Sequence, residues 1–176
     1  MHLPRQVSLA TTHVPPATAV GTTQTLHCLI VATDEARREN FGFAAREGGW
    51  DVTLCCEPEA AIALARQRLL QMAIIDLSGA AADESVNAAH SPALRFLIEQ
   101  LACTSRMLLL VCGNLDDPCE EVWARHLGVW MYLPGAIDGA ELVGLCVAAR
   151  ETIDRLAVVA RSRATRGGER KTFRLS

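Results

Sequence analysis

Apolar residues in this chain gather into five short runs that are separated by segments with a helical repeat. The runs are predicted strands and cover residues 26–31, 50–56, 72–77, 107–112 and 129–133. Several of them are apolar at nearly every position, which is typical of strands buried on both faces of a parallel sheet. The pattern therefore predicts an α/β fold in which helices cover both faces of a five-stranded parallel sheet.

Between the runs, apolar residues recur every three or four positions, as they do along one face of a helix. The predicted helices cover residues 35–47, 57–69, 93–102, 118–127 and 138 to about 163. Asp34 occupies the capping position before the first helix, and Gly48 and Gly49 follow its end. The small, polar segment 78–92 is expected to be an unusually long loop.

The ends of the chain differ from this pattern. Residues 1–25 contain Pro4, Pro15 and Pro16 and no continuous apolar stretch, which predicts a disordered leader rather than a secretory signal. We expect a domain over residues 26–160 and a basic, disordered tail over 161–176. A length of 176 residues suits one domain with two tails.

Composition narrows the range of partners. The formal net charge of −3 gives no reason to expect nucleic acid or an anionic membrane, and no apolar run approaches the ~20 residues of a membrane helix. Seven cysteines without paired C-x-x-C spacing are typical of reduced thiols. We therefore expect a cytoplasmic location.

The segment from about residue 27 to 157 resembles the receiver domain of bacterial response regulators. The run Gly128–Leu133, followed by Asp138 and by Glu141-Leu142, is similar to the pattern G-A-x-x-Y-L-x-K-P-F-x-x-x-E-L of that family. Asp76 ends the third predicted strand, where the family has its phospho-acceptor. The resemblance implies a flavodoxin-like, three-layer sandwich with an extended C-terminal helix.

The resemblance also implies a set of residues that a working receiver needs. Two carboxylates after the first strand hold Mg²⁺ together with the acceptor, a Ser or Thr follows the fourth strand, and a Lys follows the fifth. The two carboxylates, the Ser or Thr and the Lys are all absent from the matching positions, so the site resembles a degenerate pseudo-receiver. The degenerate positions are Ala32, Thr33, Cys112 or Gly113, and Gly135.

Two interpretations of Asp76 follow. The favoured one is a pseudo-receiver that acts by protein–protein interaction, independently of phosphorylation and without a cofactor. The alternative is a phosphorylatable single-domain response regulator of a two-component phosphorelay, with Asp76 as acceptor and Mg²⁺ as cofactor. Asp34 is then a second acidic candidate, although a helix cap explains it more simply.

Aromatic residues and the last helix are the candidate partner surfaces. Tyr132 matches the aromatic switch position of receivers, although a half-buried ring with its hydroxyl in water is an equal alternative. With Trp123 and Trp130 it falls in the region that receivers use for partners. Along the last helix, an apolar stripe runs past the usual end of a receiver, which predicts a homodimer or a docking helix. The stripe includes Leu145, Ala149, Ile153 and Leu156.

The remaining alternatives are less favoured. Six basic residues between Arg161 and Arg174 are expected to be a solvated tail rather than a surface for nucleic acid. A small α/β enzyme with Cys112 as nucleophile is a further alternative. It lacks an obvious base, because His126 lies in a predicted helix and His90 in a predicted loop. We therefore expect no enzymatic activity.

Overall fold

The computed structural model describes residues 25–67, 69–78, 84–103, 107–135, 137 and 139–169. The predicted leader lies outside these residues apart from its last position, and so does the end of the predicted basic tail. The boundaries proposed for the leader, the domain and the tail therefore stay predictions.

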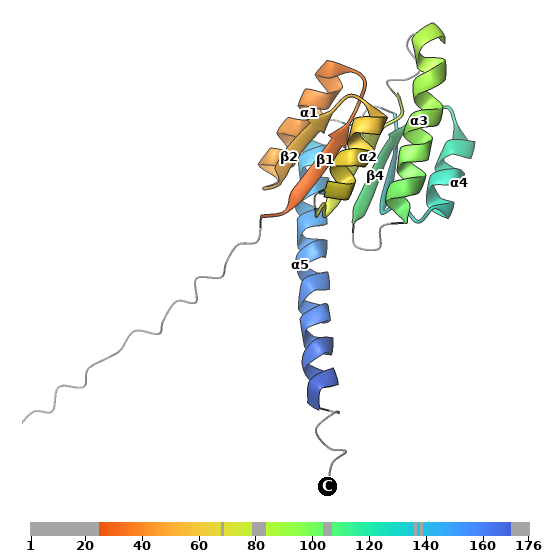
Figure 1. Ribbon diagram of the computed structural model, residues 1–176. Coiled ribbons are helices and arrows are strands. Elements are labelled where there is room, and N and C mark those ends of the chain that lie inside the picture. Colours follow the sequence, from red (N-terminus) through yellow and green to blue (C-terminus); the bar gives the residue numbers. More distant parts are fainter. Residues whose placement is uncertain are drawn as a thin grey trace, which may run out of the picture.

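Five parallel strands form one sheet, as the apolar runs predict (Figure 1). The strand order is β2-β1-β3-β4-β5, so the chain reverses direction across the sheet after β2. The strands are β1 (His27–Val31), β2 (Asp51–Cys55), β3 (Met72–Asp76), β4 (Leu108–Gly113) and β5 (Met131–Pro134). Their register places Asp76 beside Cys112, and Cys112 beside Leu133, at one edge of the sheet.

Five helices cover the two faces of the sheet, and the predicted three-layer sandwich is confirmed. The helices are α1 (Glu35–Glu47), α2 (Pro58–Gln67), α3 (Glu84–Ala102), α4 (Pro118–His126) and α5 (Gly139–Glu169). Alternate strand residues point to opposite faces, which divides the core into two apolar clusters. One cluster joins the sheet to α2, α3 and α4, and the other joins it to α1 and α5.

Helix α3 begins earlier than the sequence pattern indicates. The segment 78–92 is predicted as a loop, but α3 starts at Glu84 and contains Pro92. A proline inside a helix removes one backbone hydrogen bond and usually marks a boundary. Here the turns after Pro92 are held by buried Leu94, Leu97 and Ile98, and their packing outweighs that local cost.

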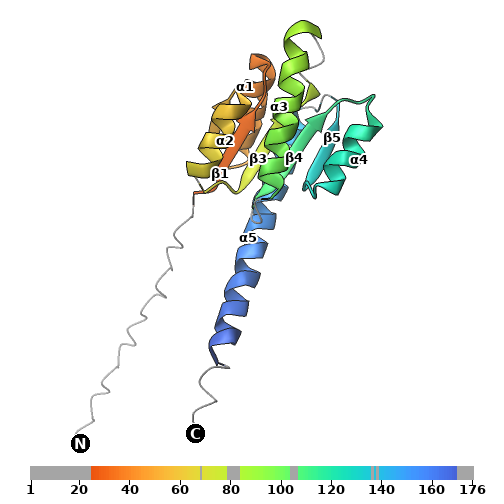
Figure 2. The ribbon, with the colours of Figure 1, turned by 45° about the vertical axis from the view of Figure 1, so that its right-hand side comes forward.

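Helix α5 is fixed to the sheet only along its first half. Its residues Leu142, Cys146 and Ala149 are buried against the sheet. The Trp50 indole N–H also donates to the Cys146 carbonyl oxygen at 2.9 Å. The helix then runs on to Glu169, past the predicted end near residue 163, and projects beyond the sheet (Figures 1 and 2). Among the described residues, no helix is long and apolar enough to span a membrane.

Candidate functional site

Asp76 lies at the carboxyl edge of the sheet, where ligand sites of open α/β folds are found. It is the last residue of β3, and its relative accessibility is 0%. A carboxylate removed from water in this way needs compensating donors, because an unpaired buried charge costs several kcal/mol. The surroundings of Asp76 supply those donors.

Arg37 of α1 forms a two-point ion pair with Asp76. Its Nε donates to Asp76 Oδ2 at 2.6 Å, and its Nη2 donates to Oδ1 at 3.1 Å. Bidentate pairs between arginine and carboxylate are among the strongest hydrogen-bonded contacts in proteins. Burial of the guanidinium opposes its charged form, but hydrogen bonding to Asp76 and its charge raise the pKa of Arg37. The charged form of Arg37 is therefore favoured beside Asp76.

Ser78 provides the remaining donors to Asp76. Its backbone N–H donates to Asp76 Oδ1 at 3.1 Å, and its hydroxyl donates to the same oxygen at 2.7 Å. Asp76 thus accepts four hydrogen bonds, and both of its oxygens are engaged. A phosphoryl donor or a metal ion would have to displace Arg37 before either oxygen became free.

Arg37 reaches Asp76 because of how α1 begins. Asp34 is the N-cap, and its side chain accepts a hydrogen bond from the Arg37 backbone N–H at 2.7 Å. The Arg37 guanidinium then extends across the sheet edge above the Phe41 ring, 5.3 Å from its centroid. Asp34 therefore has the capping role that the sequence favoured, and it holds in place the residue that pairs with Asp76.

The residues around Asp76 do not fit the magnesium site of a receiver. Mg²⁺ prefers several oxygen ligands in octahedral geometry, usually including carboxylates. The described residues contain no group of three or more His, Cys, Asp or Glu side chains that could hold a metal ion. Arg37 instead supplies the positive charge beside Asp76.

At the other degenerate positions, Ala32, Thr33 and Gly135, the backbone makes the hydrogen bonds. The carbonyl oxygens of Ala32 and Thr33 accept hydrogen bonds from Arg38 Nη1 at 2.8 and 3.3 Å. Gly135 has a φ of +78°, which favours glycine, and its N–H donates to the Gly113 carbonyl oxygen at 2.8 Å. A lysine at position 135 would be strained in this conformation.

Cys112 lies beside Asp76 on β4 and is completely buried. Burial and then the charge of Asp76 raise the pKa of the Cys112 thiol to about 12. A nucleophilic cysteine needs the opposite shift. His126 is on α4, and the side chain of His90 lies outside the described residues. The geometry therefore gives no support to the thiol-enzyme alternative.

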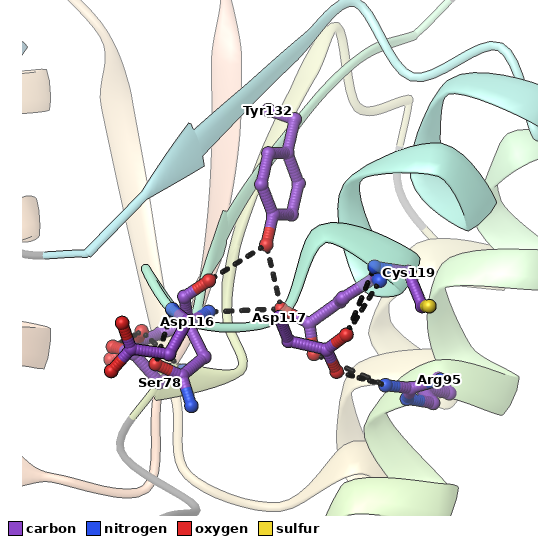
Figure 3. Close-up of polar contacts among 9 residues, drawn as sticks. Ser78, Arg95, Asp116, Asp117, Cys119 and Tyr132 are labelled. Carbon is purple, nitrogen blue, oxygen red and sulfur yellow. Dashed lines mark hydrogen bonds and ion pairs between the residues drawn. The ribbon is translucent and has the colours of Figure 1, made fainter.

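Tyr132 is buried, and its hydroxyl is not in water. It donates to Glu120 Oε1 at 2.9 Å and lies 3.4 Å from the Asn114 carbonyl oxygen. Figure 3 shows the ring pointing from β5 toward the start of α4. The alternative of a half-buried ring with a hydrated hydroxyl is wrong, because Glu120 offers a buried acceptor.

Gly113 leaves the space that this arrangement needs. A Cβ atom at residue 113 would fall well inside van der Waals contact of Glu120 Oε1 and of the Tyr132 hydroxyl. Two side chains therefore converge on position 113, which leaves no room for a side chain there. In this chain a hydroxyl from Tyr132 and a carboxylate from Glu120 occupy it.

The two tryptophans pack against different core clusters. Trp123 packs against the cluster under α2, α3 and α4, whereas Trp130 packs against the cluster under α1 and α5. Both residues are half-buried. β5 is the last strand of the sheet. A partner surface that combines Trp123, Trp130 and Tyr132 around this strand stays a prediction.

Several important residues were not predicted from the sequence. Arg37, Ser78, Arg95 and Glu120 all make side-chain contacts that define the site. The sequence carries one weak signal for Arg37: it lies three residues after the capping residue Asp34. Glu120 reads as an ordinary acidic residue in the first turn of a helix.

Comparison with known proteins supports the fold. No protein-family model and no curated protein matches the chain. Among solved structures, NtrX from Brucella abortus in complex with ADP superposes with a TM-score of 0.65 at 13% identity, over 81% of this chain and 30% of that one. The matched region is thus less than a third of the NtrX chain.

Shorter proteins match over nearly their whole length. The chemotaxis response regulator CheY4 of Vibrio cholerae gives a TM-score of 0.56 at 12% identity, over 71% of this chain and 98% of that one. HP1043, an orphan response regulator of H. pylori, gives a TM-score of 0.56 at 17% identity, over 70% of this chain and 95% of that one. The chain therefore has the fold of CheY-like receiver domains, and identities this low show the fold alone.

Proposed function

We propose that this protein is a receiver-like signalling module that acts by binding another protein chain and does not use phosphorylation of Asp76. The observation that carries the proposal is the bidentate Arg37–Asp76 pair. In this arrangement the Asp76 carboxylate is buried, is paired with the Arg37 guanidinium and accepts hydrogen bonds at both oxygens. A role in two-component signalling is inferred from the receiver fold, and binding is favoured over catalysis because the strand-end site offers no activated nucleophile.

Formation of an aspartyl phosphate would disrupt this arrangement. Phosphorylation of one Asp76 oxygen breaks at least one contact with Arg37 and leaves close to two negative charges at a buried position that carried one before. Receivers offset such charge with a metal ion and a lysine. Here position 135 is a glycine, and the carboxylates that would hold the metal are replaced by Ala32 and Thr33.

We infer that the binding partner is a second copy of the chain, joined through the second half of α5. Leu156 and Val159 are 57% and 48% exposed, although they extend the stripe that is buried at Ala149 and half-buried at Ile153. A free-standing helix is marginally stable in water without a packing partner. An identical helix supplies a matching stripe, as in a two-stranded coiled coil.

Light scattering of the full chain tests both parts of this proposal. We expect the mass of two chains, unchanged after incubation with a small-molecule phosphodonor and Mg²⁺. The mass of one chain under both conditions would contradict the proposed homodimer. A mass that changes with the phosphodonor would show that phosphorylation controls assembly, contrary to the proposal.

A further inference from the structure

Glu120 is a buried carboxylate on α4 that joins three other parts of the molecule. It is 6% exposed. Its Oε1 accepts hydrogen bonds from the Tyr132 hydroxyl at 2.9 Å and from the Asn114 N–H at 3.0 Å. Its Oε2 accepts one from Arg95 Nη2 of α3 at 3.2 Å. The carboxylate therefore connects β5, the segment after β4 and α3 to the first turn of α4.

Arg95, on the neighbouring helix α3, forms ion pairs with the two carboxylates at the start of α4. Its guanidinium also lies 3.7 Å from Asp117 Oδ2 (Figure 3). The same guanidinium stacks over the Trp123 ring, 5.1 Å from the ring centroid. Asp117 in turn caps α4 by accepting hydrogen bonds from the N–H groups of Cys119 and Glu120, both at 3.1 Å. One cation thus compensates two carboxylates, and the backbone that carries Glu120 is fixed by its own cap.

The Tyr132 hydroxyl depends on Glu120. Among the described residues, its other hydrogen-bond contact is the long one to the Asn114 carbonyl oxygen at 3.4 Å. A buried hydroxyl without a good partner is unfavourable, because its desolvation is not compensated. Burial, then the hydrogen bond to Glu120 and its charge, raise the pKa of Tyr132 above its ordinary range. The absence of a side chain at Gly113 makes room for this contact.

We propose that Glu120 is a positioning residue that fixes Tyr132 in its buried orientation, so that α4 and β5 present one permanent surface. This inference rests on the proposed function, since a module that is not switched at Asp76 does not need Tyr132 to move. Outward rotation of Tyr132 would take one of three donors away from a buried carboxylate. The cost of that loss opposes the rotation.

Tyr132 is the only tyrosine in the chain, so its signals need no assignment by mutation. We would label the full-length protein with ring-¹³C tyrosine and record contacts between the ring and buried methyl groups by NMR. The variants are Glu120→Ala, which removes the acceptor, and Glu120→Gln, which keeps the shape without the charge. Glu121→Ala is the matched control, because Glu121 is the next residue of α4 and pairs with Arg125 at the surface.

The proposal predicts that Glu120→Ala loses the contacts between the ring and the core, whereas Glu121→Ala keeps all of them. In Glu120→Gln the ring stays buried, but the midpoint of the hydroxyl titration falls toward the ordinary value of about 10, because the neighbouring negative charge is gone. This second result keeps the test decisive if Glu120→Ala does not fold. A Glu120 carboxylate that does not contact the Tyr132 hydroxyl in solution would leave the titration unchanged.

Unchanged ring contacts in a folded Glu120→Ala, or a wild-type titration midpoint in Glu120→Gln, would overturn the proposal. The same labelled sample, recorded with a phosphodonor and Mg²⁺, separates this failure from that of the proposed function. Movement of the ring under those conditions would overturn both. A ring that stays in place in the wild type but also in Glu120→Ala would overturn only the role of Glu120.

Discussion

Arg37 Nε lies 2.6 Å from Oδ2 of Asp76, a side chain with no exposed surface. The guanidinium comes from the first turns of α1, and the carboxylate comes from the end of β3. Their pairing places a covalently attached cation beside Asp76, the residue predicted from the sequence as the candidate phospho-acceptor. Since the cation belongs to the chain, its presence does not depend on metal concentration.

Replacing Arg37 tests how much the pair contributes to stability. Arg37→Ala leaves the Asp76 charge buried with Ser78 as its remaining side-chain partner, so we expect a loss of about 3 kcal/mol in the free energy of unfolding. Urea denaturation measures this loss. Arg46→Ala is the control on the same helix, since Arg46 is exposed, and it should cost less than about 0.5 kcal/mol.

A double-mutant cycle separates the pair from its surroundings. Asp76→Ala combined with Arg37→Ala should cost clearly less than the sum of the two single changes, because each single change leaves one partner uncompensated. Additive losses would mean that the two side chains do not interact in solution.

Gly113 gives a second test of stability. Gly113→Ala places a Cβ against Glu120 and Tyr132, and we expect it to destabilise the protein by about 2 kcal/mol through overpacking and a broken hydrogen bond. Gly144→Ala in α5 is the control. Apart from its chain neighbours and the nearby backbone of its own helix, no heavy atom lies within 4 Å of its added Cβ, so the change should stabilise the helix by about 0.5 kcal/mol. Equal effects of the two changes on the unfolding midpoint would contradict this account.

The thiols should divide into two groups by reactivity. Cys56, Cys103 and Cys119 are exposed, whereas Cys112 is buried and its pKa is raised to about 12. We expect alkylation of the folded protein to modify the exposed group within minutes and Cys112 only as the protein unfolds. Peptide mapping after timed quenching measures the order. Rapid modification of Cys112 would revive the thiol-enzyme alternative.

The apolar stripe of α5 predicts which substitution dissociates the dimer. Leu156→Glu places a charge on the stripe, and we expect monomers in light scattering at concentrations where the wild type is dimeric. Val158→Glu is the matched control, because Val158 is exposed to a similar degree but lies ~200° around the helix from Leu156. Dissociation by both changes, or by neither, would argue against the stripe as the interface.

Local patterns were enough to predict the sheet, both helix layers and the cap at Asp34. They failed where tertiary packing decides. Pro92 lies inside α3 because buried apolar residues hold the turns after it. Trp123 and Trp130 pack against different core clusters although they are close in sequence. The partners of Asp76 and Tyr132 come from other elements, so no spacing rule predicts Arg37 or Glu120. The proposed losses at Ala32, Thr33, Gly135 and either Cys112 or Gly113 were visible in the sequence.

The most direct measurement is the intact mass of the protein after incubation with acetyl phosphate or phosphoramidate and Mg²⁺. With Asp76 held by Arg37 and Ser78, the account predicts no added phosphoryl group in the wild type or in Asp76→Asn. A mass increase of one phosphoryl group that appears in the wild type and disappears in Asp76→Asn would contradict it, and would show that Asp76 is a working acceptor.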